Sequence, residues 1–148
     1  MPATPDTRIP ETILAFDFGL RRIGVAVGQT VTGSANPVGV VANSSEGPDW
    51  RRVEQLVSEW EPMRLVVGLP LHADGSPSEM TARVDAFIAG LERFALPIET
   101  IDERYSSAEA KQLLVAERKL DARGRIRRET IDVAAATLIA ERWLRQER

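Results

Sequence analysis

The chain has 148 residues, of which 43% are hydrophobic and 28% are charged, and its formal net charge is −3. These values favour one globular domain of ordinary size and argue against a disordered chain. The sequence contains no cysteine and one histidine, which excludes disulfide bonds, thiolate zinc sites and multi-histidine metal sites, so any bound metal would have oxygen ligands.

The first ten residues are polar and include three prolines, and we expect residues 1–10 to form a flexible tail. Residues 11–148 are then expected to form the single domain. No stretch of the sequence approaches the roughly 18 consecutive apolar residues that a membrane-spanning helix needs. We therefore expect a cytoplasmic protein without a membrane partner.

The domain is predicted to begin with strands joined in hairpins. Apolar runs predict strands over residues 12–18 and 23–29, with a turn over 19–22, and a short third strand over 38–41. Two antiparallel hairpin steps are the most economical arrangement of these segments.

Helices and strands then alternate along the chain. Helical spacing of apolar residues separates the predicted helices from short β-branched runs. The predicted elements are a loop over 43–48, a helix over 49–59, a strand over 64–69, a loop over 70–77, a helix over 78–94, a strand over 97–101, a helix over 106–119, a basic loop over 118–128 and a helix over 130–145. This order predicts an α/β sandwich around a mixed sheet of five strands, flanked by helices.

Acidic residues recur where these elements end or begin. Asp17 closes the first strand inside an otherwise apolar stretch, where a carboxylate needs a cation, a hydrogen-bond donor or a metal as partner. Asp102 and Glu103 close the fifth strand, and Asp132 opens the last helix. Ligands of α/β sheets collect beyond the carboxyl ends of the strands. If strands one and five are neighbours, Asp17 lies close to one of Asp102 and Glu103, because side chains alternate between the two faces.

Converging carboxylates without balancing cationic side chains repel one another, and divalent cations relieve that repulsion. Two magnesium ions about 4 Å apart can activate water on one side of a phosphodiester and stabilise the leaving oxygen on the other. We therefore expect Mg²⁺ or Mn²⁺ as the cofactor. The basic loop carries six basic residues and one acidic residue, and it could hold a nucleic-acid backbone through phosphates. Its candidate contacts are Arg123, Arg125, Arg127 and Arg128.

Each of these features also has a simpler explanation. Asp17 can be a turn residue before Gly19, and the acidic pair at the end of the fifth strand can be a solvated strand end with a surface ion pair. Asp132 can favour the helix dipole, and the basic loop can be an exposed run of charge. The three carboxylates together are much harder to explain in this way than each one alone.

Four segments resemble the YqgF family, also called RuvX, in the order and spacing of its motifs. They are AFDFGLRRIGVAV over 15–27, VGLPLHADGS over 67–76, DERYSSAE over 102–109 and IDVAAA over 131–136. The resemblance implies a ribonuclease H-like fold. It also implies that Asp17, Glu103 and Asp132 are the metal-binding catalytic carboxylates, with Asp102 as a helper, and that Arg21, Arg22 and Arg104 lie near the substrate.

The family is described as Holliday junction resolvases and as nucleases that mature the 5′ end of pre-16S ribosomal RNA. The resemblance thus implies a magnesium-dependent phosphodiesterase acting on structured RNA, with precursor ribosomal RNA or an assembling small subunit as partner. Two alternatives stay open, namely a DNA junction resolvase, which needs a symmetric dimer, and a non-catalytic RNA-binding assembly factor. No dimer signature is visible, and we expect a monomer or a weak homodimer.

A sugar kinase or actin-like ATPase can also open on Asp-x-Gly before an apolar strand. Such proteins place the nucleotide between two domains of this kind, for which 148 residues are too few. The sequence also lacks a glycine–lysine phosphate loop. This class of protein is therefore excluded.

Overall fold

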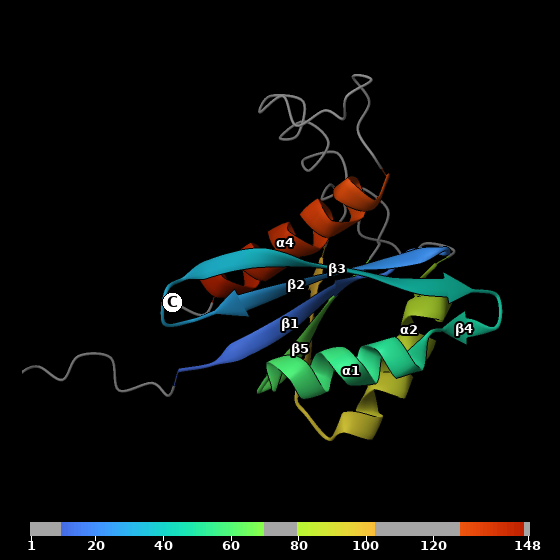
Figure 1. Cartoon of the computed structure of the whole chain (residues 1–148), viewed down its shortest axis with the longest axis horizontal. Coiled ribbons are helices and arrows are strands. Elements are labelled where there is room, and N and C mark those ends of the chain that lie inside the picture. Colours follow the sequence, from blue (N-terminus) through green and yellow to red (C-terminus); the bar gives the residue numbers. More distant parts are fainter. Residues whose placement is uncertain (1–9, 70–79, 103–127, 147–148) are drawn as a thin grey trace, which may run out of the picture.

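The computed structural model describes residues 10–69, 80–102 and 128–146, with side chains in the last segment described from Val133 onward. A mixed sheet crosses the centre of the molecule, with helices on both faces (Figure 1). Within these residues the sheet has six strands in the order β4-β3-β2-β1-β5-β6. Their bounds are Thr12–Asp17 for β1, Arg22–Gln29 for β2, Ser34–Ser44 for β3, Gly47–Pro48 for β4, Arg64–Leu69 for β5 and Ile98–Asp102 for β6.

The sheet is antiparallel on one side and parallel on the other. β1 pairs antiparallel with β2, and β2 pairs antiparallel with β3, so the predicted hairpins are confirmed. β1 pairs parallel with β5, and β5 pairs parallel with β6. The carboxyl ends of β1, β5 and β6 consequently lie at the same edge of the sheet, where the sequence placed its acidic residues.

The prediction of five strands was wrong by one, and the third strand is longer than predicted. β3 pairs with β2 from Ser34 to Ala42, although residues 34–37 contain turn-forming residues. Pro37 is tolerated there because the register shifts on β2 beside its partner Ala26, and prolines in sheets occur at such irregularities. The predicted loop over 43–48 contains β4, which pairs with Asn43 and Ser44 of β3.

The predicted helices over 49–59, 78–94 and 130–145 correspond to α1 (Trp50–Trp60), α2 (Thr81–Leu91) and α4 (Arg128–Gln146). The Asp49 side chain caps α1 by accepting a hydrogen bond from the backbone N–H of Arg52. The predicted end of the second helix was wrong, because a 3-10 turn over Glu92–Phe94 follows α2 and Ala95 then adopts a left-handed φ of 55°. The tail over 1–9, the loop over 70–77 and the helix over 106–119 lie outside the described residues.

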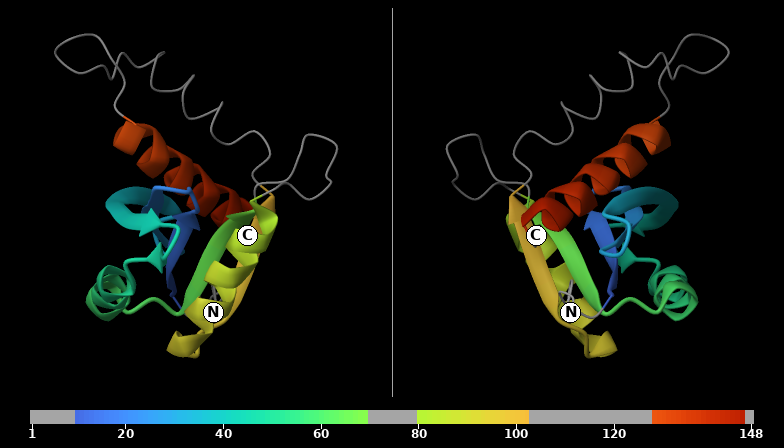
Figure 2. Two further views of the ribbon diagram at one scale, coloured as in Figure 1. Left: turned by 90° about the vertical axis from the view of Figure 1, so that its right-hand side faces the viewer. Right: turned by 90° about the vertical axis from the view of Figure 1, so that its left-hand side faces the viewer.

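Two hydrophobic cores lie between the sheet and its helices, one on each face of the sheet. α1 and α2 cover one face, where Phe16, Leu56 and Phe87 are buried. α4 covers the other face, where Ile13 and Trp143 are buried. Figure 2 shows these helices on either side of the sheet, so the predicted sandwich is confirmed. Among the described residues, no helix is long and apolar enough to cross a membrane.

Candidate active site

Asp17 stands at the carboxyl end of β1 and is half-buried. Ile13 and Ala15 of the same strand are buried in the core beneath α4, while Leu14 and Phe16 are buried on the opposite face. Alternation along β1 therefore turns Asp17 toward the α4 face of the sheet. Asp17 thus ends a buried strand, as predicted, and is itself partly accessible to solvent.

The strands beside Asp17 place glycines next to it. Gly24 of β2 is its register partner, and Gly68 of β5 lies one residue beyond the pair formed by Phe16 and Val67. Neither glycine carries a side chain that could cover the carboxylate from the flanking strand. The end of β1 therefore presents the Asp17 carboxylate between two strands whose nearest residues are glycines.

The expected juxtaposition of strands one and five was wrong in one respect. The predicted fifth strand is β6, and β5 lies between it and β1. The register puts Phe16, Val67 and Thr100 at one level, so β1 and β6 are two strand spacings, or roughly 10 Å, apart. The short apolar run that forms β5 occupies the position between them and pairs in parallel with both.

Asp102 does not share a face with Asp17. Glu99 accepts a hydrogen bond of 2.9 Å from Nε1 of Trp143 in α4, and Ile101 is buried in the core beneath α4. Alternation along β6 therefore turns Asp102 to the opposite face, and its side chain is exposed. Its backbone carbonyl accepts a hydrogen bond of 3.1 Å from Nη1 of Arg142. Of the acidic pair, Asp102 is thus the member that faces away from Asp17.

The other predicted site residues fall at or beyond the limits of the described segments. Glu103, Arg104, Arg123, Arg125 and Arg127 lie outside the described residues, and Arg128 and Asp132 belong to α4 without described side chains. Residue 132 precedes Ala135 and Ala136, which are buried against the sheet, by three and four positions. In Figures 1 and 2, α4 begins at the end of the molecule that holds the turn between β1 and β2. Among the described side chains, no three acidic or histidine residues gather as a metal site.

The turn after Asp17 is held by a residue that the sequence did not single out. Nδ2 of Asn43 donates a hydrogen bond of 2.7 Å to the carbonyl of Gly19, and the Asn43 backbone N–H donates one of 3.0 Å to the carbonyl of Arg21. A Cβ atom at Gly19 would lie 2.5 Å from the carbonyl oxygen of Arg22, so only glycine fits there. Arg21 is exposed and Arg22 is half-buried. Asn43 lies 24 residues from Gly19 in sequence, and no local pattern could have shown the contact.

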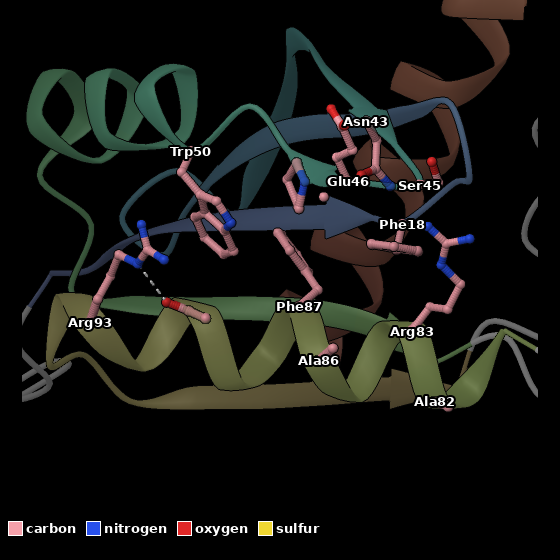
Figure 3. Close-up of a pocket in the computed structure, with 13 residues that line it drawn as sticks. Phe18, Asn43, Ser45, Glu46, Trp50, Ala82, Arg83, Ala86, Phe87 and Arg93 are labelled. Carbon is pink, nitrogen blue, oxygen red and sulfur yellow. Dashed lines mark hydrogen bonds between the residues drawn. The ribbon is translucent and has the colours of Figure 1, made fainter.

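A cleft of about 430 Å³ opens between α2 and the β3–β4 hairpin (Figure 3). It lies on the face opposite to α4. Trp50 stacks on Phe87 at 5.5 Å between ring centroids, and the guanidinium of Arg93 lies 4.0 Å from the Trp50 ring. A Cβ atom at Gly90 would lie 2.3 Å from Trp50, so this glycine makes room for the indole. Trp50 is half-buried and lies between Phe87 and Arg93 in Figure 3, which favours a role in packing over base stacking.

The chain matches one known protein family and several named relatives. The RuvX family model, described as Holliday junction resolvase, matches residues 11–146. A protein of Azotobacter vinelandii is 48% identical over 136 residues, covering 91% of this chain and 94% of its own length. One of Burkholderia lata is 46% identical over 136 residues, covering 91% and 89%. Both relatives are named as candidate pre-16S rRNA nucleases.

Solved structures show the same fold at low sequence identity. Thermus thermophilus RuvC in complex with a Holliday junction substrate superposes with a TM-score of 0.54 at 13% identity, covering 93% of this chain and 95% of that one. The fowlpox virus Holliday junction resolvase superposes with a TM-score of 0.57 at 10% identity, covering 93% and 99%. The fold is thus that of the ribonuclease H-like resolvases, and the chain belongs to the RuvX family.

Proposed function

We propose that this protein is a metal-dependent nuclease that hydrolyses phosphodiester bonds in structured RNA, with the 5′ end of pre-16S ribosomal RNA as its target. The observation that carries the proposal is Asp17, a half-buried carboxylate at the carboxyl end of β1 with glycines on both flanking strands. The names of the relatives supply the substrate. We further propose that it acts in the cytoplasm as a monomer or weak homodimer.

The carboxylates that we assign to catalysis are Asp17, Glu103 and Asp132. We do not include Asp102 among the metal ligands, because it stands on the face of the sheet opposite to Asp17. Glu103 follows the last residue of β6 directly in the sequence, next to the edge of the sheet where β1 also ends. Asp132 belongs to the first part of α4, which packs on the sheet through Ala136. The proposed site therefore lies between the carboxyl edge of the parallel strands and the start of α4.

The donor set fits a hard divalent cation. Carboxylate oxygens are the ligands that Mg²⁺ and Mn²⁺ prefer, and the sequence offers no cysteine and one histidine. When bound, the metal supplies an activated water and stabilises the leaving oxygen. The backbone that carries Asp17 is held in place because Asp17 pairs with Gly24 of β2 and the preceding residue pairs with Val67 of β5. Arg21 and Arg22, four and five residues further on, supply positive charge for the phosphates of the substrate.

Cleavage of DNA junctions is the competing activity. The family description and the names of the solved structures favour it, whereas the relatives with nearly half of their residues in common are named for RNA. The fold alone does not distinguish an RNA substrate from a DNA junction, so an experiment has to compare cleavage of the two substrates. A non-catalytic RNA-binding factor would bind the same RNA and leave it intact.

We expect purified protein to shorten a precursor 16S transcript only when Mg²⁺ or Mn²⁺ is present, leaving a 5′-phosphate and a 3′-hydroxyl. Removal of the metal with a chelator should stop the reaction, and added Mg²⁺ should restore it, because the metal is expected to activate the attacking water and stabilise the leaving oxygen. Gel analysis of end-labelled RNA measures both results. A four-way DNA junction serves as the competing substrate. Faster cleavage of the junction would replace the RNA assignment, and binding of RNA without cleavage would overturn the enzyme assignment.

We expect replacement of Arg125, Arg127 and Arg128 by alanine to weaken RNA binding across sequences. Three lost phosphate contacts should reduce the slope of log affinity against log salt by about 2 to 3. Titrations of a fluorescent RNA at several salt concentrations measure the slope. The double replacement of Arg51 and Arg145, which are exposed on α1 and α4, is the control for loss of positive charge elsewhere. Equal slopes for wild type and the triple variant would exclude the basic loop from the interface.

A further inference from the structure

Leu20 is an exposed apolar residue at the tip of the turn between β1 and β2. Its side chain is 48% exposed, and it belongs to neither hydrophobic core. Single exposed leucines are common on protein surfaces and by themselves mean little. The surroundings of Leu20 are what distinguish it.

The backbone around Leu20 is fixed from both sides. Asn43 donates hydrogen bonds to the carbonyls of Gly19 and Arg21, the residues directly before and after Leu20. The contact between Gly19 and the Arg22 carbonyl leaves no space for a side chain at residue 19. The backbone of the tip is therefore held in place on both sides of Leu20, a residue that is 48% exposed.

Leu20 also lies close to the proposed site of cleavage. It stands three positions after Asp17, so the two Cα atoms are within about 11 Å of each other even for an extended chain. Arg21 and Arg22 follow directly and carry the charge that attracts phosphates. A strand whose scissile phosphate lay at Asp17 would bring a neighbouring nucleotide to Leu20.

We propose that Leu20 is an apolar wedge that packs against an unpaired or unstacked base of the RNA next to the cleaved bond, with Asn43 as the positioning residue for the wedge. Leucine is among the side chains that proteins insert between base steps. The wedge gives the nuclease a preference for bulged or single-stranded segments over continuous duplex, because a paired and stacked base offers it no face. This inference rests on the proposed function.

The chain offers a matched control for each of the two residues. Val31 is 71% exposed in the turn between β2 and β3, at the opposite end of β2, and it resembles Leu20 in being an exposed apolar tip. Asn36 is an exposed asparagine near the far end of β3, the strand that also carries Asn43. Replacements at Val31 and Asn36 therefore repeat the chemistry of the test at a distance from Asp17.

The test uses the full chain with Asp17→Asn to prevent cleavage, an RNA hairpin with a bulge that contains 2-aminopurine, and a fully paired hairpin of equal length. Leu20→Ser should weaken binding of the bulged RNA by roughly five- to tenfold and leave the paired RNA within about twofold. It should also remove the fluorescence increase that reports unstacking. Leu20→Met should retain both properties, and Asn43→Ala should resemble Leu20→Ser. Val31→Ser and Asn36→Ala should bind as the parent does.

The same variants with Asp17 intact distinguish the loss of a base contact at Leu20 from a general loss of RNA binding. Leu20→Ser should raise KM for the bulged RNA by a similar factor with kcat little changed, and its salt slope should equal that of wild type, whereas Arg21→Ala should lower the slope by about 1. Equal loss of affinity for bulged and paired RNA, or wild-type behaviour of Leu20→Ser, would overturn the wedge and leave the nuclease assignment intact. Absence of RNA binding and cleavage by wild type would overturn both.

Discussion

Asp17→Asn is expected to reduce cleavage of the precursor transcript by about three orders of magnitude or more, with little change in RNA affinity. The substitution keeps the shape of the side chain and removes its negative charge, so a divalent cation loses a ligand that contributes several kcal/mol to the transition state. Because Asp17 is half-buried at the end of a strand, the amide fits the same space. Single-turnover cleavage rates at saturating Mg²⁺ test this prediction. Thermal unfolding of the same samples shows whether the variant is still folded.

Asp102→Asn is the matched control for this variant. Both residues end a parallel strand at the same edge of the sheet, and both changes remove one carboxylate charge. Asp102 stands on the opposite face and is exposed, so its replacement should change the rate by less than about threefold. If the two variants are equally slow, general electrostatics rather than metal ligation explains the loss. An Asp17→Asn protein as fast as wild type would contradict the catalytic assignment.

The sequence predicted the layers of the fold better than the ends of its elements. Apolar periodicity is strong in β1, β2 and α1, whose observed bounds differ from the predicted ones by one residue. β3 was predicted too short because its first half, Ser34–Pro37, forms a strand only through long-range pairing with β2. β4 consists of two residues, a length at which no periodicity exists.

The candidate site was predictable as a set of residue types and only partly as an arrangement. The carboxyl ends of β1 and β6 do lie at one edge, as the alternation of strands and helices indicated. The position of β5 between them, and the face on which Asp102 lies, depend on strand order and register, which follow from the packing of distant segments. The hydrogen bonds of Asn43 to the β1–β2 turn belong to the same class of long-range information.

The end of α4 is fastened to the sheet by a small polar network. Arg64 at the start of β5 forms an ion pair of 2.9 Å with Glu11 and a second one with Glu99. The hydrogen bond to Glu11, together with Glu99 and against the effect of burial, raises the pKa of the Arg64 guanidinium above its ordinary value. Trp143 of α4 lies over that guanidinium at 5.6 Å and donates its Nε1 hydrogen bond to Glu99. The network therefore joins α4 to β5 and β6.

Trp143→Ala is expected to lower the free energy of unfolding by about 3 to 5 kcal/mol, which is a large share of the stability of an ordinary domain. Trp143 is 1% exposed, so truncation leaves a cavity beneath α4 and removes the indole donor from Glu99. Urea unfolding followed by circular dichroism measures the loss. Because α4 also carries Asp132, the cleavage rate should fall at temperatures where the variant is still folded.

Two phenylalanine variants separate packing from hydrogen bonding. Trp143→Phe keeps a ring in the core and removes the donor to Glu99, and we expect it to cost about 1 to 2 kcal/mol. Trp60→Phe removes a buried Nε1 that has no hydrogen-bond partner within the described part of the chain, and it should be neutral or slightly stabilising. If Trp143→Phe changes the free energy of unfolding as little as Trp60→Phe does, the hydrogen bond to Glu99 adds no stability and α4 is held by apolar packing alone. If it costs as much as Trp143→Ala, the polar network is what holds α4, and with it the residue that we assign to catalysis, against the sheet.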